Sequence, residues 1–302
     1  MMENNLLYII GNGFDRHHDF PTSYCDFENF MEDWSREMYY EIHEFWNFKF
    51  NKNNGKWCDF ENDLSSYNSS KMYSECAKKY SAPEDIADEC SVVTEQIYNG
   101  ITDCFLEWVK SIQLKPRTKR LLLSPNAQYI NFNYTRTLQD IYEIPEKSIW
   151  HIHGSSLDKE VIFGHKVKQE IKYNYSDDTG MPSTEEEWDE DAWRFAKLPL
   201  SKFRKKTEQV ISKNRTQFLR YLDLETIYVL GHSLADVDLP YFEMIQEKNK
   251  LTKWYVSYYN DSEQKYLCSQ LKKVGVQKYQ IEMIKMTDLD ATIEKTTPQH
   301  FV

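Results

Sequence analysis

Cysteine pairs at metal-binding spacing are missing from this sequence of 302 residues. The six cysteines are scattered along the chain, none of them forms a C-x-x-C pair, and no histidine stands at zinc-finger spacing from them. These absences disfavour a structural zinc site, and we expect no bound metal. They also favour reduced thiols, which are typical of cytoplasmic proteins.

Long apolar runs are also lacking, and no stretch approaches the roughly 20 consecutive apolar residues that a membrane helix requires. We expect no signal peptide, because acidic Glu3 and polar Asn4 and Asn5 lead straight into a five-residue apolar run. We therefore expect a cytoplasmic protein without a membrane partner.

The sequence contains fewer basic residues than acidic ones. Lysine and arginine number 37 against 48 aspartates and glutamates, which gives a net charge of −11 and a pI of about 5.3. An acidic surface repels phosphate backbones, so nucleic acid is an unlikely partner. Basic residues cluster at 115–120 and 202–206, and we interpret both clusters as solvated faces.

Short apolar runs are what the sequence does contain, and several of them end in glycine or small polar residues. Helical patterns lie between several of the runs, at 137–141, 203–222 and 241–248. Strands that alternate with helices predict an α/β protein with a Rossmann-like, mostly parallel sheet and helices on both faces. The expected strands are 6–10, 127–132, 148–153, 161–163, 226–230 and 253–258.

Two segments interrupt this alternation. Residues 24–112 carry apolar side chains at helical spacing and predict a largely helical insertion, with a loop at 51–56 and a break at 81–83. Residues 165–200 contain turn-forming residues and an acidic run at 185–191, so we expect an exposed, lid-like insertion there. Aromatic residues make up 15% of the chain, and we predict that most of them form core. We expect residues 1–302 to form a single domain that carries both insertions.

The first predicted strand ends in Gly11-Asn12-Gly13-Phe14-Asp15. Glycines at such a turn let the backbone approach a phosphate, whose charge the following helix can stabilise. Arg16 stands where the full dinucleotide fingerprint has a third glycine, so a tight turn without a ligand is an equal alternative. Asp15 could accept a hydrogen bond from a sugar hydroxyl of a ligand, or it could cap the following helix.

Three later strand ends carry comparable residues, and parallel strands present their carboxyl ends at one edge of a sheet. The asparagines Asn131 and Asn133 can hold a ribose hydroxyl or a water, or can form a turn. His153, followed by Gly154, is a candidate general base, with a structural histidine as the alternative. Gly231, His232, Ser233 and Asp236 follow the clearest later strand and offer contacts to a phosphate or ribose. A serine-hydrolase elbow is disfavoured, because Ala235 stands at the second glycine position.

These segments, in this order, resemble the AbiH family of bacterial abortive-infection proteins over residues 6 to 260. One departure is Asp19, where a small residue such as glycine is expected. The matching stretches are Ile10–Asp15, Pro21–Tyr24, Trp57–Glu61, Asn131–Thr135, His151–Gly154, Lys205–Thr207 and Val229–Phe242.

AbiH proteins are in turn similar to sirtuin-like domains, in which an asparagine and a histidine act on the ribose of NAD. The resemblance implies that Asn133 and His153 take these two catalytic roles and that NAD is the ligand. Thr135 stands where many sirtuin-like effectors have aspartate, and the cysteine quartet of deacetylases is missing. The implied chemistry is therefore NAD hydrolysis by an anti-phage effector. The implied ligand contacts are Gly11, Asn12, Gly13, Phe14, Asp15, Thr22, Asn131, Gly154, Gly231, His232, Ser233 and Asp236.

Two other function classes stay open. The same pocket could bind a nucleotide or ADP-ribose without turnover and act through a partner. A nuclease is the third class, which the acidic charge disfavours; Asp15, Asp236 and Asp238 are its only candidate carboxylates. A phage-derived or host activator protein and a homo-oligomer are further candidate partners.

Overall fold

The computed structural model of the chain describes residues 5–52, 55–114, 118–167 and 184–289. The chain divides into two compact units. The sheet unit comprises Met1–Thr22, Val109–Ile162 and Lys206–Val302, and the helical unit comprises Ser23–Trp108 and Phe163–Lys205. The two segments that the sequence sets apart as insertions, 24–112 and 165–200, therefore contribute to the same unit.

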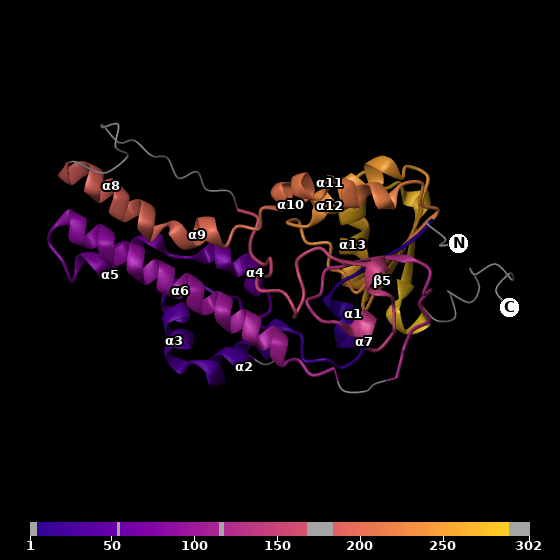
Figure 1. Cartoon of the computed structure of the whole chain (residues 1–302), viewed down its shortest axis with the longest axis horizontal. Coiled ribbons are helices and arrows are strands. Elements are labelled where there is room, and N and C mark those ends of the chain that lie inside the picture. Colours follow the sequence, from indigo (N-terminus) through magenta and orange to yellow (C-terminus); the bar gives the residue numbers. More distant parts are fainter. Residues whose placement is uncertain (1–4, 53–54, 115–117, 168–183, 290–302) are drawn as a thin grey trace, which may run out of the picture. The chain divides into compact units, whose positions relative to one another are not determined.

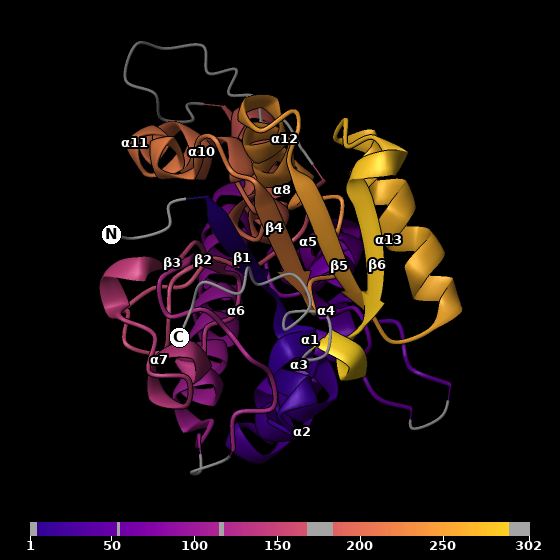
Figure 2. The same cartoon turned by 90° about the vertical axis from the view of Figure 1, so that its right-hand side faces the viewer.

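The described residues of the sheet unit form six strands that are all parallel, in the order β3-β2-β1-β4-β5-β6 (Figure 2). The strands are β1 (Leu6–Ile10), β2 (Gln128–Asn131), β3 (Ile149–His151), β4 (Thr226–Leu230), β5 (Lys253–Tyr258) and β6 (Ile281–Lys285). This order is that of a doubly wound, Rossmann-like sheet, in which the direction of winding reverses between β1 and β4. The predicted α/β class is confirmed.

Helices cover both faces of this sheet, as the two apolar clusters show. One cluster joins Leu7, Ile9 and Val229 to α10 (Thr207–Lys213), α11 (Arg215–Phe218), α12 (Leu239–Lys248) and α13 (Asp261–Lys273). The other joins Tyr8 and Ile10 to α1 (Asn12–His17) and α7 (Thr137–Asp140). Alternating residues of β1 thus enter opposite layers, as the two-residue period of a strand requires. Short 3-10 turns lie at Glu146–Ser148, Leu219–Tyr221, Lys278–Gln280 and Met286–Asp288.

A row of four tyrosines crosses the middle of the sheet. Tyr129, Tyr8, Tyr228 and Tyr255 occupy paired positions on β2, β1, β4 and β5. Their rings stack in sequence with centroid separations of 5.0, 5.2 and 4.9 Å. Such pairs contribute about 0.5–1.5 kcal/mol each beyond area burial. The row gives part of the aromatic excess a structural role, as predicted.

Three elements of the sheet unit differ from expectation. Residues 161–163 form no strand; Ile162 donates one backbone bond to the carbonyl of His153, 2.8 Å long. Strand β6 and helix α13 are present although the sequence analysis did not predict them. Within the described ranges strand β6 pairs with β5 alone, and it is partly exposed at the edge of the sheet, so its apolar signal is weak.

The helical unit is built from the predicted helical segment together with residues beyond 163 (Figure 1). Its core is aromatic: the Phe27 ring lies 5.0–5.1 Å from the rings of Phe60, Phe105 and Trp108. The break at 81–83 is confirmed, because one helix ends at Ala77 and the next begins at Pro83. The helices are α2 (Tyr24–Trp34), α3 (Arg36–Phe45), α4 (Phe60–Asp63), α5 (Ser69–Ala77), α6 (Pro83–Ser111), α8 (Glu185–Ala196) and α9 (Leu198–Lys202), with a 3-10 turn at Leu64–Ser66.

The acidic run at 185–191 differs from the expected exposed loop. It forms the first turns of α8, which begins at a capping box between Thr184 and Glu187. Helix α8 packs on α5, where Tyr73 and Trp193 stack with centroids 4.2 Å apart. Two of the acidic residues, Glu187 and Asp191, are buried as a result. The turn residues at 180–184 that suggested a loop lie mostly outside the described residues.

A membrane-crossing helix is absent from the described ranges, where no helix combines sufficient length with sufficient apolar character.

Candidate functional site

The carboxyl ends of β1 and β4 are neighbours at the point where the winding of the sheet reverses. Open α/β sheets bind ligands in the crevice outside such a switch point. Two predicted motifs, Gly11–Asp15 and Gly231–Asp236, directly follow these two strands. The structure therefore brings the first and last predicted motifs together.

Glycine is required in these two turns because the turns touch through their backbones. A Cβ atom on Gly11 would lie 2.4 Å from Cα of His232, and one on Gly231 would lie 2.1 Å from the amide nitrogen of Phe14. Gly231 also has a φ of +65°, which side chains disfavour. The Gly11 amide donates to the carbonyl of Leu230 (2.9 Å) and the Gly13 amide to that of Gly231 (2.7 Å). Both glycine amides thus serve the packing of the turns, and their role toward a ligand stays a prediction.

Strand β5 holds both turns in place. Ser257 accepts a 2.8 Å hydrogen bond from the Gly231 amide, and the Tyr259 hydroxyl donates a 2.5 Å bond to the carbonyl of Gly13. Neither residue was predicted from the sequence. Their position at and just beyond the end of an expected strand was the signal that could have identified them.

Other predicted residues around the turns have mixed surroundings. Asn12 is exposed, and its side-chain amide donates to the Thr22 carbonyl (2.7 Å). The Thr22 hydroxyl is buried and has no hydrogen-bond partner among the described residues. Ser233 is exposed, whereas the Phe14 ring is fully buried in the core. Asp236 accepts a 2.8 Å bond from Gln270 of α13.

Asp15 lies inside the protein, where its carboxylate accepts hydrogen bonds from two threonines. Thr135 and Thr137 donate to its two oxygens, the latter over 2.7 Å. Burial raises the pKa of Asp15 to about 6, against which the bonds from Thr135, Thr137 and Asn133 act. This carboxyl therefore links the β1 turn to the segment that follows β2. Thr135, which stands where many sirtuin-like effectors have aspartate, supplies one of the two hydrogen bonds.

The two asparagines after β2 belong to the same network. Asn133 donates from its side chain to the Gly11 carbonyl (3.1 Å), and its own amide donates to the side-chain oxygen of Asn131 (3.0 Å). Both asparagines are buried. The asparagine motif and the glycine motif thus meet, and we define Asp15, Asn131, Asn133, Thr135 and Thr137 as the carboxylate–amide cluster.

His151 supports this cluster from β3. Its Nδ1 donates to the carbonyl of Asn133 (3.1 Å), which fixes Nε2 as the acceptor for the Gln139 amide (2.9 Å) in the neutral ring. Burial lowers the pKa of His151, which favours that neutral form. These contacts give His151 a structural role.

A second group of predicted residues surrounds Asp238. Its carboxylate oxygens lie 3.7 Å from Nε2 of His153 and 3.9 Å from Nε2 of His232, and all three side chains are buried. Nδ1 of His232 accepts a bond from the Leu234 amide, so its Nε2 carries the proton in the neutral ring. We define His153, His232 and Asp238 as the imidazole–carboxylate cluster.

Phe132 packs against both histidines of the second cluster. The centroid of its ring lies 5.1 Å from the ring centroid of His153 and 4.2 Å from that of His232. Asn133, the next residue, reaches back to Gly11 instead. The structure therefore joins Asn133 to Asp15, and it brings His153 and His232 to Asp238. Gly154, beside His153, has a φ of +86° and lies against the carbonyl of Glu160.

Tyr241 of α12 lies beside the second cluster, and the sequence did not predict it as a site residue. Its ring centroid lies 5.6 Å from that of His153 and 5.7 Å from that of Phe132. The sequence suggested Asp238 only as a candidate metal-binding carboxylate of a nuclease. A tyrosine in an apolar helix pattern gives no signal of its own, because such residues are mostly core.

Family-like motifs also meet within the helical unit. Glu61 accepts a hydrogen bond from Tyr24 (2.7 Å) and another from the Gly164 amide (3.1 Å), and it pairs with buried Lys205 (2.9 Å). The stretches 21–24, 57–61 and 205–207, far apart in sequence, thus contribute to one hydrogen-bonded group. These contacts give the residues of the three stretches a structural role that requires no ligand.

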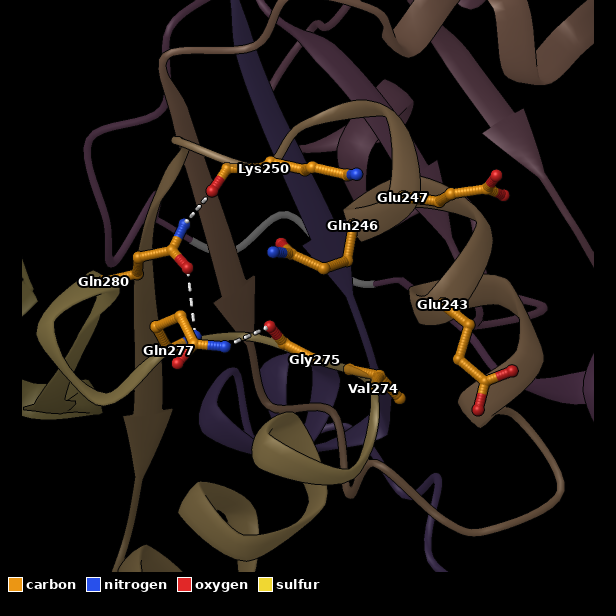
Figure 3. Close-up of a pocket in the computed structure, with 8 residues that line it drawn as sticks. All are labelled: Glu243, Gln246, Glu247, Lys250, Val274, Gly275, Gln277 and Gln280. Carbon is orange, nitrogen blue, oxygen red and sulfur yellow. Dashed lines mark hydrogen bonds between the residues drawn. The ribbon is translucent and has the colours of Figure 1, made fainter.

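A groove of about 420 Å³ lies elsewhere on the sheet unit (Figure 3). Lys250 lies three residues before the start of β5 and Gln280 directly precedes β6, so the groove belongs to the amino ends of these strands. Figure 3 shows Gln280 bonded to the carbonyl of Lys250 and to Gln277. The predicted site residues do not line this groove, which is formed by Glu243, Gln246, Glu247, Lys250, Val274, Gly275, Gln277 and Gln280.

A metal-binding group is not found in the part of the chain that the structure describes, where no three or more His, Cys, Asp or Glu side chains are suitably arranged. The prediction of no bound metal stays untested.

The chain matches a model of a protein family. Among curated proteins and among solved structures, no match was found for this chain. The family model described as "Bacteriophage abortive infection AbiH" matches residues 7–258, a range that contains both clusters. The chain therefore belongs to the AbiH family, which indicates a role in the abortive infection of bacteriophage.

Proposed function

We propose that the chain binds NAD at the carboxyl ends of β1, β2 and β4 and hydrolyses it to nicotinamide and ADP-ribose. The observation that carries the proposal is the meeting of two glycine turns with a buried histidine–aspartate pair at one switch point. Sheets with this strand order bind dinucleotides at that point.

The phosphates would lie against the exposed residues of the two turns. Asn12 and Ser233 are exposed there, whereas the Gly11 and Gly13 amides already donate inside the protein. The glycines would act by bringing the two turns together. This arrangement supports a phosphate contact through Asn12 and Ser233 and a close approach of the backbone.

Hydrolysis requires breakage of the bond between ribose C1′ and the nicotinamide nitrogen. The bonding electrons stay on that nitrogen, which neutralises the pyridinium, and the sugar acquires oxocarbenium character. The oxygen of a water then bonds to C1′ and one water proton is released. His153 would accept this proton, and Asp238 beside it would stabilise the resulting imidazolium.

Asn133 would act on the ribose from the other cluster. Its side chain is positioned by the Gly11 carbonyl and by the Asp15 network. A group held this firmly can orient a sugar hydroxyl or a water at little entropic cost.

Binding without turnover is the second candidate. The observation that favours it is the burial of both His153 and Asn133, with relative exposures of 2% and 6%. In that case the pocket would hold a nucleotide or ADP-ribose and a partner protein would act. An activator protein and a homo-oligomer remain predictions under either candidate.

Chromatography of nicotinamide and ADP-ribose after incubation of the purified protein with NAD tests the proposal. We expect wild type to release both products in equal amounts and His153→Gln to release them about 10²–10⁴-fold more slowly. Lys250→Ala, in the groove at the opposite strand ends, is the matched control and should match wild type. Equal rates for His153→Gln and wild type would end the hydrolytic mechanism. A protein that binds NAD but releases no nicotinamide would favour the binding module.

A further inference from the structure

Tyr241 is fully buried at the start of α12, yet its hydroxyl oxygen has no hydrogen-bond partner among the described residues. The ring is well packed, against Phe132 on one side and His153 on another. Packing therefore explains the aromatic ring and leaves the hydroxyl unexplained.

Burial of a hydroxyl without a partner destabilises the folded state, and buried polar groups in proteins are almost always paired. Phenylalanine would supply the same ring without this cost. Tyr241 differs from other such hydroxyls, that of Tyr67 among them, because its ring packs against His153 of the imidazole–carboxylate cluster, so a ligand bound there can supply the partner.

The surroundings of the hydroxyl limit what that partner can be. Burial raises the pKa of Tyr241, and the negative charges of Asp238 and Glu208 raise it further, so the phenol stays protonated and can donate. The same charges disfavour a phosphate at this place. A sugar hydroxyl suits the position, because it can accept a bond from a phenol and also donate one to a carboxylate.

We infer that Tyr241 is a further ligand-contacting residue, whose hydroxyl donates a hydrogen bond to a ribose hydroxyl of the nucleotide bound beside His153. This inference rests on the proposed function, since it takes the occupant of the imidazole–carboxylate cluster to be a ribosyl nucleotide. It adds a specificity role: a ligand without that hydroxyl would leave the phenol unpaired.

Tyr241→Phe tests the inference, because it removes one oxygen and retains the ring. Tyr67→Phe in the helical unit is a matched control, since the Tyr67 hydroxyl is also buried without a partner among the described residues. Melting temperatures without ligand and dissociation constants for NAD, ADP-ribose and ATP would be measured for both variants and wild type.

We expect both variants to be at least as stable as wild type without ligand, because each loses an unpaired buried hydroxyl. The dissociation constant of Tyr241→Phe should rise about five- to tenfold, the worth of one hydrogen bond, and that of Tyr67→Phe should be unchanged. The rise should be seen with whichever of the three nucleotides binds wild type.

Three outcomes would overturn the inference. Equal affinity of Tyr241→Phe and wild type would do so and would leave nucleotide binding standing. A fall in the ligand-free melting temperature of Tyr241→Phe alone would show that the hydroxyl has a partner within the protein. Failure of all three nucleotides to bind wild type would overturn both this inference and the proposed function. Binding of ADP-ribose or ATP but not of NAD would overturn only the proposal that NAD is the substrate.

Discussion

Thr135 donates a hydrogen bond to the buried carboxylate of Asp15, across 120 positions of the chain. The bond connects the turn after β1 with the segment after β2, and so connects two motifs that the sequence places far apart. Asp15 depends on it because a buried carboxylate without donors is costly. The Asp15 network is therefore the element that fixes Asn133 beside the glycine turn.

Thr135→Val should test that role. Loss of the hydroxyl removes one donor from a buried carboxylate while it preserves side-chain shape, so we expect the free energy of unfolding to fall by about 1–3 kcal/mol. Urea denaturation provides the measurement. Thr94→Val is the control, because the buried Thr94 hydroxyl bonds only to carbonyls of its own helix and its loss should cost far less. Equal costs for the two variants would argue against the network.

The raised pKa of Asp15 predicts a specific dependence of stability on pH. Its pKa is about 6 in the folded protein against 3.8 as the ordinary value, so between these values the folded state binds the proton more tightly than the unfolded state. Stability is then lost as the pH rises from about 4 to 6, by roughly 3 kcal/mol in total. Asp15→Asn cannot ionise and should escape this loss.

The difference in unfolding free energy between Asp15→Asn and wild type isolates this one group from the other titrations. We expect the difference to shift in favour of the variant as the pH rises through that window. A difference that stays constant from pH 4 to 7 would show that the carboxyl has an ordinary pKa.

Asp19 explains why glycine is expected in the opening loop. It follows α1 with a φ of +57°, in the left-handed region, and its carboxylate pairs with Arg120. Asp19→Gly and Asp19→Ala both remove that pair, and only glycine adopts the left-handed conformation without strain. We expect the glycine variant to be more stable than the alanine variant by about 1 kcal/mol in thermal denaturation. An alanine variant of equal stability would contradict this account.

The sequence predicted the strands that are buried on both faces, because their signal is local. Leu6–Ile10 and Thr226–Leu230 are continuous apolar runs that end in glycine, and both are central strands. Strand β6 escaped prediction because an edge strand that is exposed on one side needs less apolar character. The sequence also identified the glycine, asparagine and histidine motifs that the sheet order brings to one edge.

The contacts between these motifs could not be predicted, because they depend on residues distant in sequence. Asp15 has the sequence context of a helix cap or sugar ligand, and only the fold brings Thr135 and Thr137 to it. Tyr241 has the pattern of a core residue, and only the fold places it beside His153. The glycine amides, expected to face a phosphate, donate to carbonyls of the neighbouring turn.

The location of a bound nucleotide tests the central claim most directly, and a crystal structure of the protein with ADP-ribose would provide it. The account predicts the phosphates beside Asn12 and Ser233 and a ribose within hydrogen-bond distance of His153. Density for the ligand in the groove between α12 and the start of β6, or at any place away from the carboxyl ends of β1 and β4, would contradict it.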